Sequence, residues 1–123
     1  MDIVAKILVG WVAVSHVLFG VMEMFLWQKP AGRKVFKTSD EEAEHGAVLA
    51  KNQGLYNYFL AAGLIWGLLI SDPTQALHTQ TFFLVCVAVA GVYGAATASK
   101  AIIVVQGLPA MLALGAVWAV AGA

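Results

Sequence analysis

The 123-residue sequence has little charge. Lys, Arg, Asp and Glu together make up 11% of it, and the formal net charge is zero, whereas a soluble domain carries about 25% charged residues. No basic block is long enough to indicate nucleic-acid binding. Hydrophobic residues make up 61%, against about 45–50% in an ordinary domain. This excess is too large for a globular core and indicates an integral membrane protein.

The residue groups that carry the commonest catalytic chemistries are also missing. The single cysteine, Cys86 in the run FFLVCVAVAG, excludes an intramolecular disulfide and reads as a small hydrophobic residue. No His, Cys, Asp or Glu cluster has the spacing of a metal site, and neither a Gly-rich phosphate loop nor a Ser-His-Asp set is visible. We therefore expect no metal site.

Long apolar stretches are what the sequence does contain. A helix needs about 20 mostly apolar residues to span a membrane, and the stretches that qualify lie at about 4–27, 48–70, 79–99 and 101–122. The second helix itself is expected to begin near 44. The first lacks a basic start and is longer than a signal peptide's core, so we expect a true transmembrane helix. The short later connections predict antiparallel neighbours, so residues 1–123 form one all-α domain, an antiparallel four-helix bundle.

Basic residues flanking the spans predict the orientation of the bundle. The third loop holds Lys100, and the first loop holds Lys29, Arg33, Lys34 and Lys37. The opposite side has only Lys6. The positive-inside rule places the first and third loops in the cytoplasm and both termini outside. Within the spans, Gly63 and Gly67 form a small-xxx-small pair, which predicts close helix packing either within the chain or between protomers.

On this topology the polar side chains of all four helices lie at one depth, in the cytoplasmic half. They are Glu23 on the first helix, Asn52, Gln53, Tyr56 and Asn57 on the second, Tyr93 on the third and Gln106 on the fourth. An ionisable group within a span costs about 2.5–3.5 kcal/mol on insertion scales, so Glu23 needs donors such as these amides. Gln53, Tyr56 and Asn57 follow a helical spacing that puts them on one face. The cluster is either a lined cavity or interhelical hydrogen bonding that only stabilises the bundle.

His16 shares a helix face with Gly20 and Glu23 and is the deepest titratable group. A lone histidine in a span is a packing residue, a proton carrier or an axial ligand to a haem. The sequence leaves these three interpretations open.

Several stretches together resemble a known family over essentially the whole chain. They are EMFLW, KPAGRKVFKTS, LAKNQGLYNYFLAAGL, VAGVYGAATAS and VQGLPAML. They closely resemble a bacterial and fungal family of small four-helix membrane proteins, the domain of unknown function thirteen-zero-four. That resemblance implies a fold and no particular activity.

A remoter similarity is to the MAPEG proteins, which are membrane enzymes of eicosanoid and glutathione metabolism, and to styrene oxide isomerase. It implies a MAPEG-like homotrimer with sites between protomers near the cytoplasmic interface. Leu49, Gln53 and Tyr56 replace an Arg, an Asn and a Glu of the MAPEG pattern, which argues against glutathione as a cofactor.

The resemblance to the epoxide isomerase implies roles for individual residues. Asn57 matches a substrate-binding asparagine and Tyr93 a substrate-binding tyrosine, but Lys51 stands where that enzyme has a haem-ligating histidine. A haem here would have to be held by His16 or His45.

We therefore expect a membrane-embedded, enzyme-like protein that binds a small lipophilic substrate near the cytoplasmic interface and isomerises or opens an epoxide. Tyr93, Asn57 and Glu23 would be catalytic, and Asn52, Gln53, Tyr56 and Gln106 would bind the substrate. The alternatives are a small proton-coupled transporter and a non-catalytic assembly or lipid-binding protein. The partners expected are the lipid bilayer, the substrate and further copies of the chain, with a trimer favoured.

Overall fold

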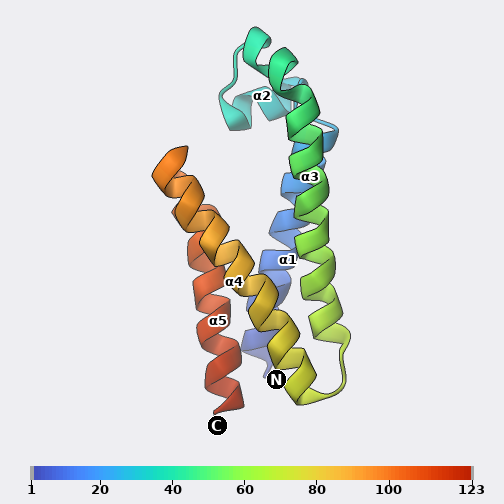
Figure 1. The fold of residues 1–123 in the computed structure, drawn as a ribbon, viewed down its shortest axis with the longest axis vertical. Helices are drawn as coiled ribbons and strands as arrows, with labels where there is room; N and C mark the ends of the chain where they lie inside the picture. The colour runs from blue at the N-terminus through green and yellow to red at the C-terminus, as the bar shows by residue number, and fades with distance from the viewer. Residues whose placement is uncertain (1, 123) are drawn as a thin grey trace. The chain divides into compact units, whose positions relative to one another are not determined.

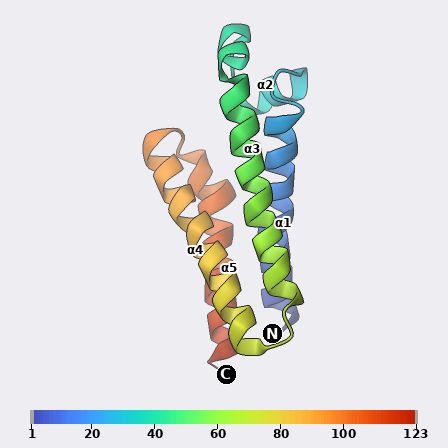
Figure 2. The ribbon, with the colours of Figure 1, turned by 45° about the vertical axis from the view of Figure 1, so that its right-hand side comes forward.

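The computed structural model describes residues 2–122, and every regular element in that range is helical. The elements in chain order are α1 (Ile3–Met24), α2 (Pro30–Phe36), α3 (Asp40–Leu69), α4 (Pro73–Thr97), the π-helical turn η1 (Ile103–Gly107) and α5 (Leu108–Ala121) (Figures 1 and 2). The chain divides into two compact units, residues 14–61 and residues 2–13 with 62–122. The all-α class expected from the sequence is confirmed.

Within residues 2–122, three stretches of helix are long and apolar enough to cross a membrane: Ile3–Met24, Pro73–Thr97 and Ile103–Ala121. They indicate an integral membrane protein, as the composition predicts. The helix α3, expected to span from about 48 to 70, is not among them. Its 30 residues are long enough, but Asn52, Gln53 and Asn57 interrupt its apolar sequence.

The first loop is largely helical, although its sequence shows no helical pattern. The helix α1 ends at Met24, three residues before the expected boundary, and α3 begins at Asp40, four residues before the expected 44. Between them lies α2, which starts with Pro30 at a position where a missing N–H costs nothing. It ends at Phe36, and its C-cap Lys37 has a φ of 55°, which lies in the left-handed region. In this loop, only Phe25 to Gln28 and Thr38 lie outside a helix or its caps.

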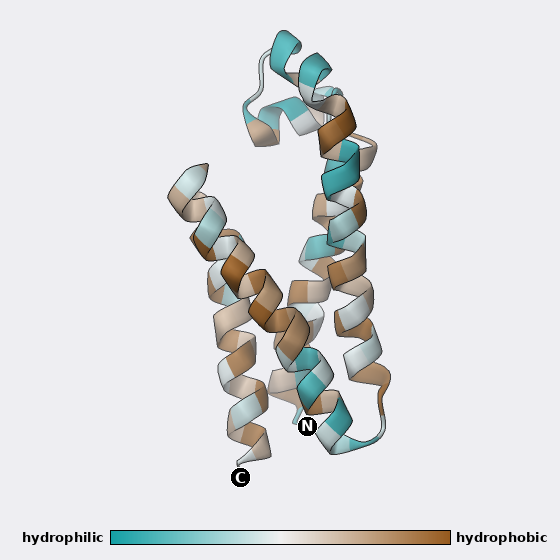
Figure 3. Ribbon diagram, viewed as in Figure 1, coloured by the Kyte–Doolittle hydropathy of each residue, from teal (hydrophilic) through white to brown (hydrophobic). Residues whose placement is uncertain are grey.

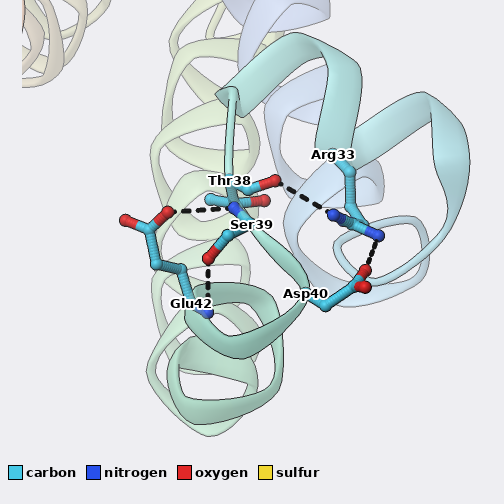
Figure 4. A network of polar contacts seen from close by, with 5 residues as sticks. All are labelled: Arg33, Thr38, Ser39, Asp40 and Glu42. Atoms are coloured by element: carbon cyan, nitrogen blue, oxygen red, sulfur yellow. Dashed lines mark hydrogen bonds and ion pairs between the residues drawn. The ribbon is translucent and has the colours of Figure 1, made fainter.

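A capping box begins α3. The Glu42 amide donates to Ser39 Oγ over 3.1 Å, and the Ser39 amide donates to Glu42 Oε1 over 2.9 Å (Figure 4). Each side chain thereby satisfies one amide that the helix start leaves unpaired. Arg33 adds an ion pair to Asp40 and a hydrogen bond to the Thr38 carbonyl. These contacts fix the direction in which the polypeptide enters α3.

Trp27 closes the same loop against α3. Its indole Nε1 donates to the Ala43 carbonyl over 2.9 Å, and its ring lies 4.9 Å from that of Phe36. Figure 3 shows that hydrophilic residues gather over α2 and the start of α3. The unit of residues 14–61 is therefore an α1–α3 hairpin with an ordered polar cap.

In the other unit, the end of α3 and the start of α4 form a second hairpin. Asp72 caps α4 by accepting from the Gln75 amide at 2.9 Å. Gln80 is fully buried and donates through Nε2 to the Gly67 carbonyl over 2.9 Å. A Cβ built on Gly67 would lie 2.7 Å from Gln80 Cγ, and Gly63 faces the ring of Phe83. The small-xxx-small pair of α3 thus serves packing within the chain.

The last span packs against α4 through a π-helical turn. At this turn Gly91 of α4 and Gly107 meet so closely that a Cβ on Gly91 would lie 2.5 Å from the Gly107 Cα. Pro109 follows two residues later and cannot donate an amide hydrogen. Further along, Trp118 Nε1 donates to Thr81 Oγ1 over 3.0 Å. A close backbone contact at the π-helical turn and an indole hydrogen bond from α5 therefore join the last span to α4.

Candidate functional site: a carboxylate and an amide within the hairpin

The carboxyl group of Glu23 and the amide of Asn57 meet inside the unit of residues 14–61. Asn57 Nδ2 donates to Glu23 Oε1, joining the last turn of α1 to the middle of α3. Asn57 is only 7% exposed, and Glu23 is half-buried. Two of the three residues that the sequence nominates as catalytic are therefore in direct contact.

Two glycines bring the helices close enough for this contact. A Cβ on Gly54 of α3 would lie 2.6 Å from Met24 Cγ and 3.0 Å from the Gly20 carbonyl oxygen. Gly20 in turn packs against the ring of Tyr58, where a Cβ would lie 2.7 Å from Tyr58 Cδ1. A larger residue at either glycine would push the two helices apart. The glycines thus set the distance at which a short amide on α3 reaches a carboxylate on α1.

The other polar residues on this part of α3 point elsewhere. Asn52, Gln53 and Tyr56 are all exposed, with Tyr56 at 54%. The face that the spacing assigns to Gln53, Tyr56 and Asn57 is thus divided. The structure brings Asn57, and not the other three side chains, to Glu23.

Tyr93 and Gln106 belong to the unit that contains α4 and α5. Tyr93 is 69% exposed near the end of α4, and its carbonyl accepts a 2.7 Å hydrogen bond from Thr97 Oγ1. Gln106 lies half-buried in the π-helical turn, beside the Gly91–Gly107 contact. Both members of the carboxylate–amide pair belong to the hairpin of residues 14–61.

His16 is buried at 1% exposure, and its ring meets that of Phe19 edge-on at 5.3 Å. Among residues 2–122, no three His, Cys, Asp or Glu side chains lie close enough together to hold a metal ion.

The Glu23–Asn57 pair has a defined chemical capacity. The amide occupies one carboxyl oxygen, so the other oxygen of Glu23 remains able to accept or deliver a proton. The hydrogen bond from the Asn57 amide holds the carboxyl group in one orientation. The pair can therefore act as an oriented acid or base, or as a polar anchor for a ligand.

Sequence reasoning missed the residues that position this pair, Gly54 and Tyr58. The spacing of Ala50, Gly54 and Ala61 on α3 is a readable signal, because small residues at i, i+4 and i+11 mark the face where another helix comes close. Asn57 falls within that face. The small residues, more than the polar ones, identify the inward side of α3.

The fold and this pair define an all-helical integral membrane protein with a carboxylate held by an amide between two helices. The chain matches the family described as protein of unknown function (DUF1304) over residues 10–118, and it belongs to that family. It is 34% identical over 116 residues to the uncharacterized protein YpaA of Lactococcus lactis subsp. lactis (strain IL1403), covering 93% of this chain and 96% of that protein. No solved structure matches the chain.

Proposed function

We propose that this protein is a membrane-embedded enzyme that binds a small lipophilic substrate beside the Glu23–Asn57 pair and isomerises or opens an epoxide-like ring. The observation that carries the proposal is the contact itself. A carboxyl group inside an apolar span costs about 2.5–3.5 kcal/mol on insertion scales. The hairpin retains it and orients it with an amide that is nine-tenths buried.

The proposed reaction uses the carboxyl oxygen that Asn57 leaves available. A protonated Glu23 gives its proton to the epoxide oxygen while the bond from that oxygen to the more substituted carbon breaks. A hydride then shifts from the neighbouring carbon to the cationic one, and the oxygen returns its proton to Glu23 as the carbonyl forms. The product is an isomer of the substrate, so no oxidant, reductant or water is consumed. Glu23 acts first as general acid and then as general base.

The remaining candidates have supporting roles in this proposal. Asn52, Gln53 and Tyr56, which lie on the same hairpin, orient the substrate. The reaction needs no haem, and His16 serves as a packing residue.

We further propose a MAPEG-like four-helix bundle in which α3 is the fourth span. Its 30 residues have a length of about 45 Å at 1.5 Å per residue, which exceeds the bilayer core of about 30 Å. In this arrangement the first and third loops are cytoplasmic and both termini lie outside. We propose that the bundles associate as a homotrimer, and the exposed amides of Asn52 and Gln53 support self-association, because uncovered amides at membrane depth are stabilised when a second copy pairs with them.

The experiment that tests the function is turnover of a panel of lipophilic epoxides by the purified protein in lipid nanodiscs, with products identified by mass spectrometry. We expect carbonyl isomers from the wild type and at least a hundredfold lower rate from Glu23→Gln, in line with the 10²–10⁴-fold contribution of general acid–base catalysis. Glu44→Gln is the matched control, since Glu44 is an exposed carboxylate on the same hairpin. Absence of turnover across the panel, or equal loss in both variants, would refute the proposal. Proton release on ligand addition without turnover would instead indicate a transporter.

A further inference from the structure

A hollow of about 400 Å³ lies at the loop end of the α1–α3 hairpin. Its wall is formed by the last residues of α1, by the segment leading to α2 and by one side of α3, including Met24, Phe25, Trp27, Lys29 and Lys51. The volume falls within the range of about 300–1,000 Å³ that ligand sites occupy. Neither Glu23 nor Asn57 lines it, so the hollow is separate from the proposed catalytic pair.

The lining of the hollow combines apolar and cationic residues. Met24 is the final residue of the α1 span, and Phe25, which follows it, is 64% exposed. Lys29 and Lys51 are exposed, and in the described part of the chain neither forms an ion pair, whereas Arg33 is paired with Asp40. Two lysines without a carboxylate partner among the described residues therefore line one hollow, which lies beside the end of the α1 span.

The location fixes the kind of molecule that matches this pattern. Residues that directly follow a transmembrane span lie at the level of the lipid headgroups, whichever side of the membrane that is. Trp27 lines the same hollow, and tryptophan is enriched at that level. Basic pockets near span ends bind anionic headgroups, while exposed apolar side chains contact the first carbons of the acyl chains. Charge, depth and apolar contact all point to the same occupant.

We propose that this hollow binds the headgroup of an anionic phospholipid, with Lys29 and Lys51 contacting the phosphate and with Met24 and Phe25 contacting the start of an acyl chain. The proposal goes beyond the proposed enzyme activity and does not depend on it. The bound lipid is part of the membrane surrounding the protein and is not consumed.

The test is native mass spectrometry of the purified protein in detergent, titrated with phosphatidylglycerol or with phosphatidylcholine of the same acyl chains. We expect one phosphatidylglycerol to be retained in preference to phosphatidylcholine. Each lysine near an anionic headgroup is worth about fivefold in affinity, so Lys29→Gln with Lys51→Gln should weaken retention about 25-fold. Replacing both lysines by Arg should preserve the retention, because the charge is kept.

Lys34→Gln with Lys37→Gln is the matched control, since both lysines are exposed in the same loop and neither lines the hollow. Equal weakening in the control pair would show unspecific attraction to the basic loop and overturn the proposal. Equal retention of the two lipids would overturn it as well. If inorganic phosphate at the same concentration displaced the lipid, the site would be one for a free anion, and the lipid assignment would be wrong.

Discussion

Replacing Asn57 by Leu should destabilise the protein more than replacing Asn57 and Glu23 together. Asn57 Nδ2 donates a hydrogen bond to Glu23 Oε1 across the contact between α3 and α1. Asn57→Leu leaves a half-buried carboxyl group without this donor. In Glu23→Leu with Asn57→Leu, no polar group is left unpaired, and two apolar side chains take the place of the pair.

The expected magnitudes follow from the position of the pair. An interhelical hydrogen bond in a membrane protein is worth about 0.6 kcal/mol on average and about 1.7 kcal/mol at most. A carboxyl group stranded within a span costs about 2.5–3.5 kcal/mol on insertion scales. Because Glu23 lies in the last turn of α1 and is half-buried, we expect Asn57→Leu to cost about 2 kcal/mol. The double variant should cost less than about 1 kcal/mol, since removing both partners of a buried pair is nearly neutral.

Equilibrium unfolding in mixed micelles, followed by helical circular dichroism, measures both free energies. Gln75→Leu is the matched control, because Gln75 is an exposed amide at the start of α4, and it should change stability by no more than about 0.5 kcal/mol. Additive costs of the two single substitutions would refute the reasoning, since independent residues add and paired residues do not.

Three further outcomes follow from contacts in the hairpin of residues 14–61 and from one position outside it. Gly54→Ala would place a Cβ 2.6 Å from Met24 Cγ and should cost about 1–3 kcal/mol in the same unfolding assay. Gly10→Ala is the control, because a Cβ there would meet no neighbouring atom within 4 Å, and it should be neutral or stabilising. Equal effects of the two substitutions would contradict the close approach of α1 and α3. Ser39→Ala removes the cap of α3 and should cost about 1 kcal/mol of local stability. The loss should be measured as faster hydrogen exchange of the amides in the first turn of α3. Unchanged exchange would contradict the capping box. Hydrogen bonds from the Ser39 amide and then its side chain hold the pKa of Glu42 below its usual value of 4.5. The folded pKa is the lower one, so the stabilisation is present above pH 4.5 and is lost as the pH falls through the lowered value; a carboxyl titration by NMR at or above 4.5 would contradict it.

The membrane helices were predictable because their signal is long and strong. Apolar runs of more than twenty residues leave few alternatives to a span, and the described helices α1 and α4 lie where those runs are. The helix α2 is different, because seven residues are too few to show a helical period. Pro30 at its start and the Ser39–Glu42 spacing after it were the available signals.

The pairing of Glu23 with Asn57 was predictable in kind, since a carboxyl group in a span needs a donor and the nearby amides were few. Which of these amides contacts Glu23 was not predictable from the sequence. Tyr56 and Asn57 are separated by about 100° around the helix, so a stripe that includes both is wide enough to cross from the buried to the exposed side. Gly54 determines which side of α3 faces α1, because α1 packs closely where α3 has no side chain.

The most direct test of this account is solid-state NMR of the protein in lipid bilayers, measuring the dipolar coupling between the Glu23 side-chain carboxyl carbon and the Asn57 side-chain nitrogen. Labelled Glu and Asn, with Glu23→Gln as the control that removes the assigned signal, make the measurement specific. The account predicts a cross-peak that reports the two groups in hydrogen-bond contact. A resolved Glu23 carboxyl signal that shows no coupling to Asn57, but couples to a different amide, would contradict it.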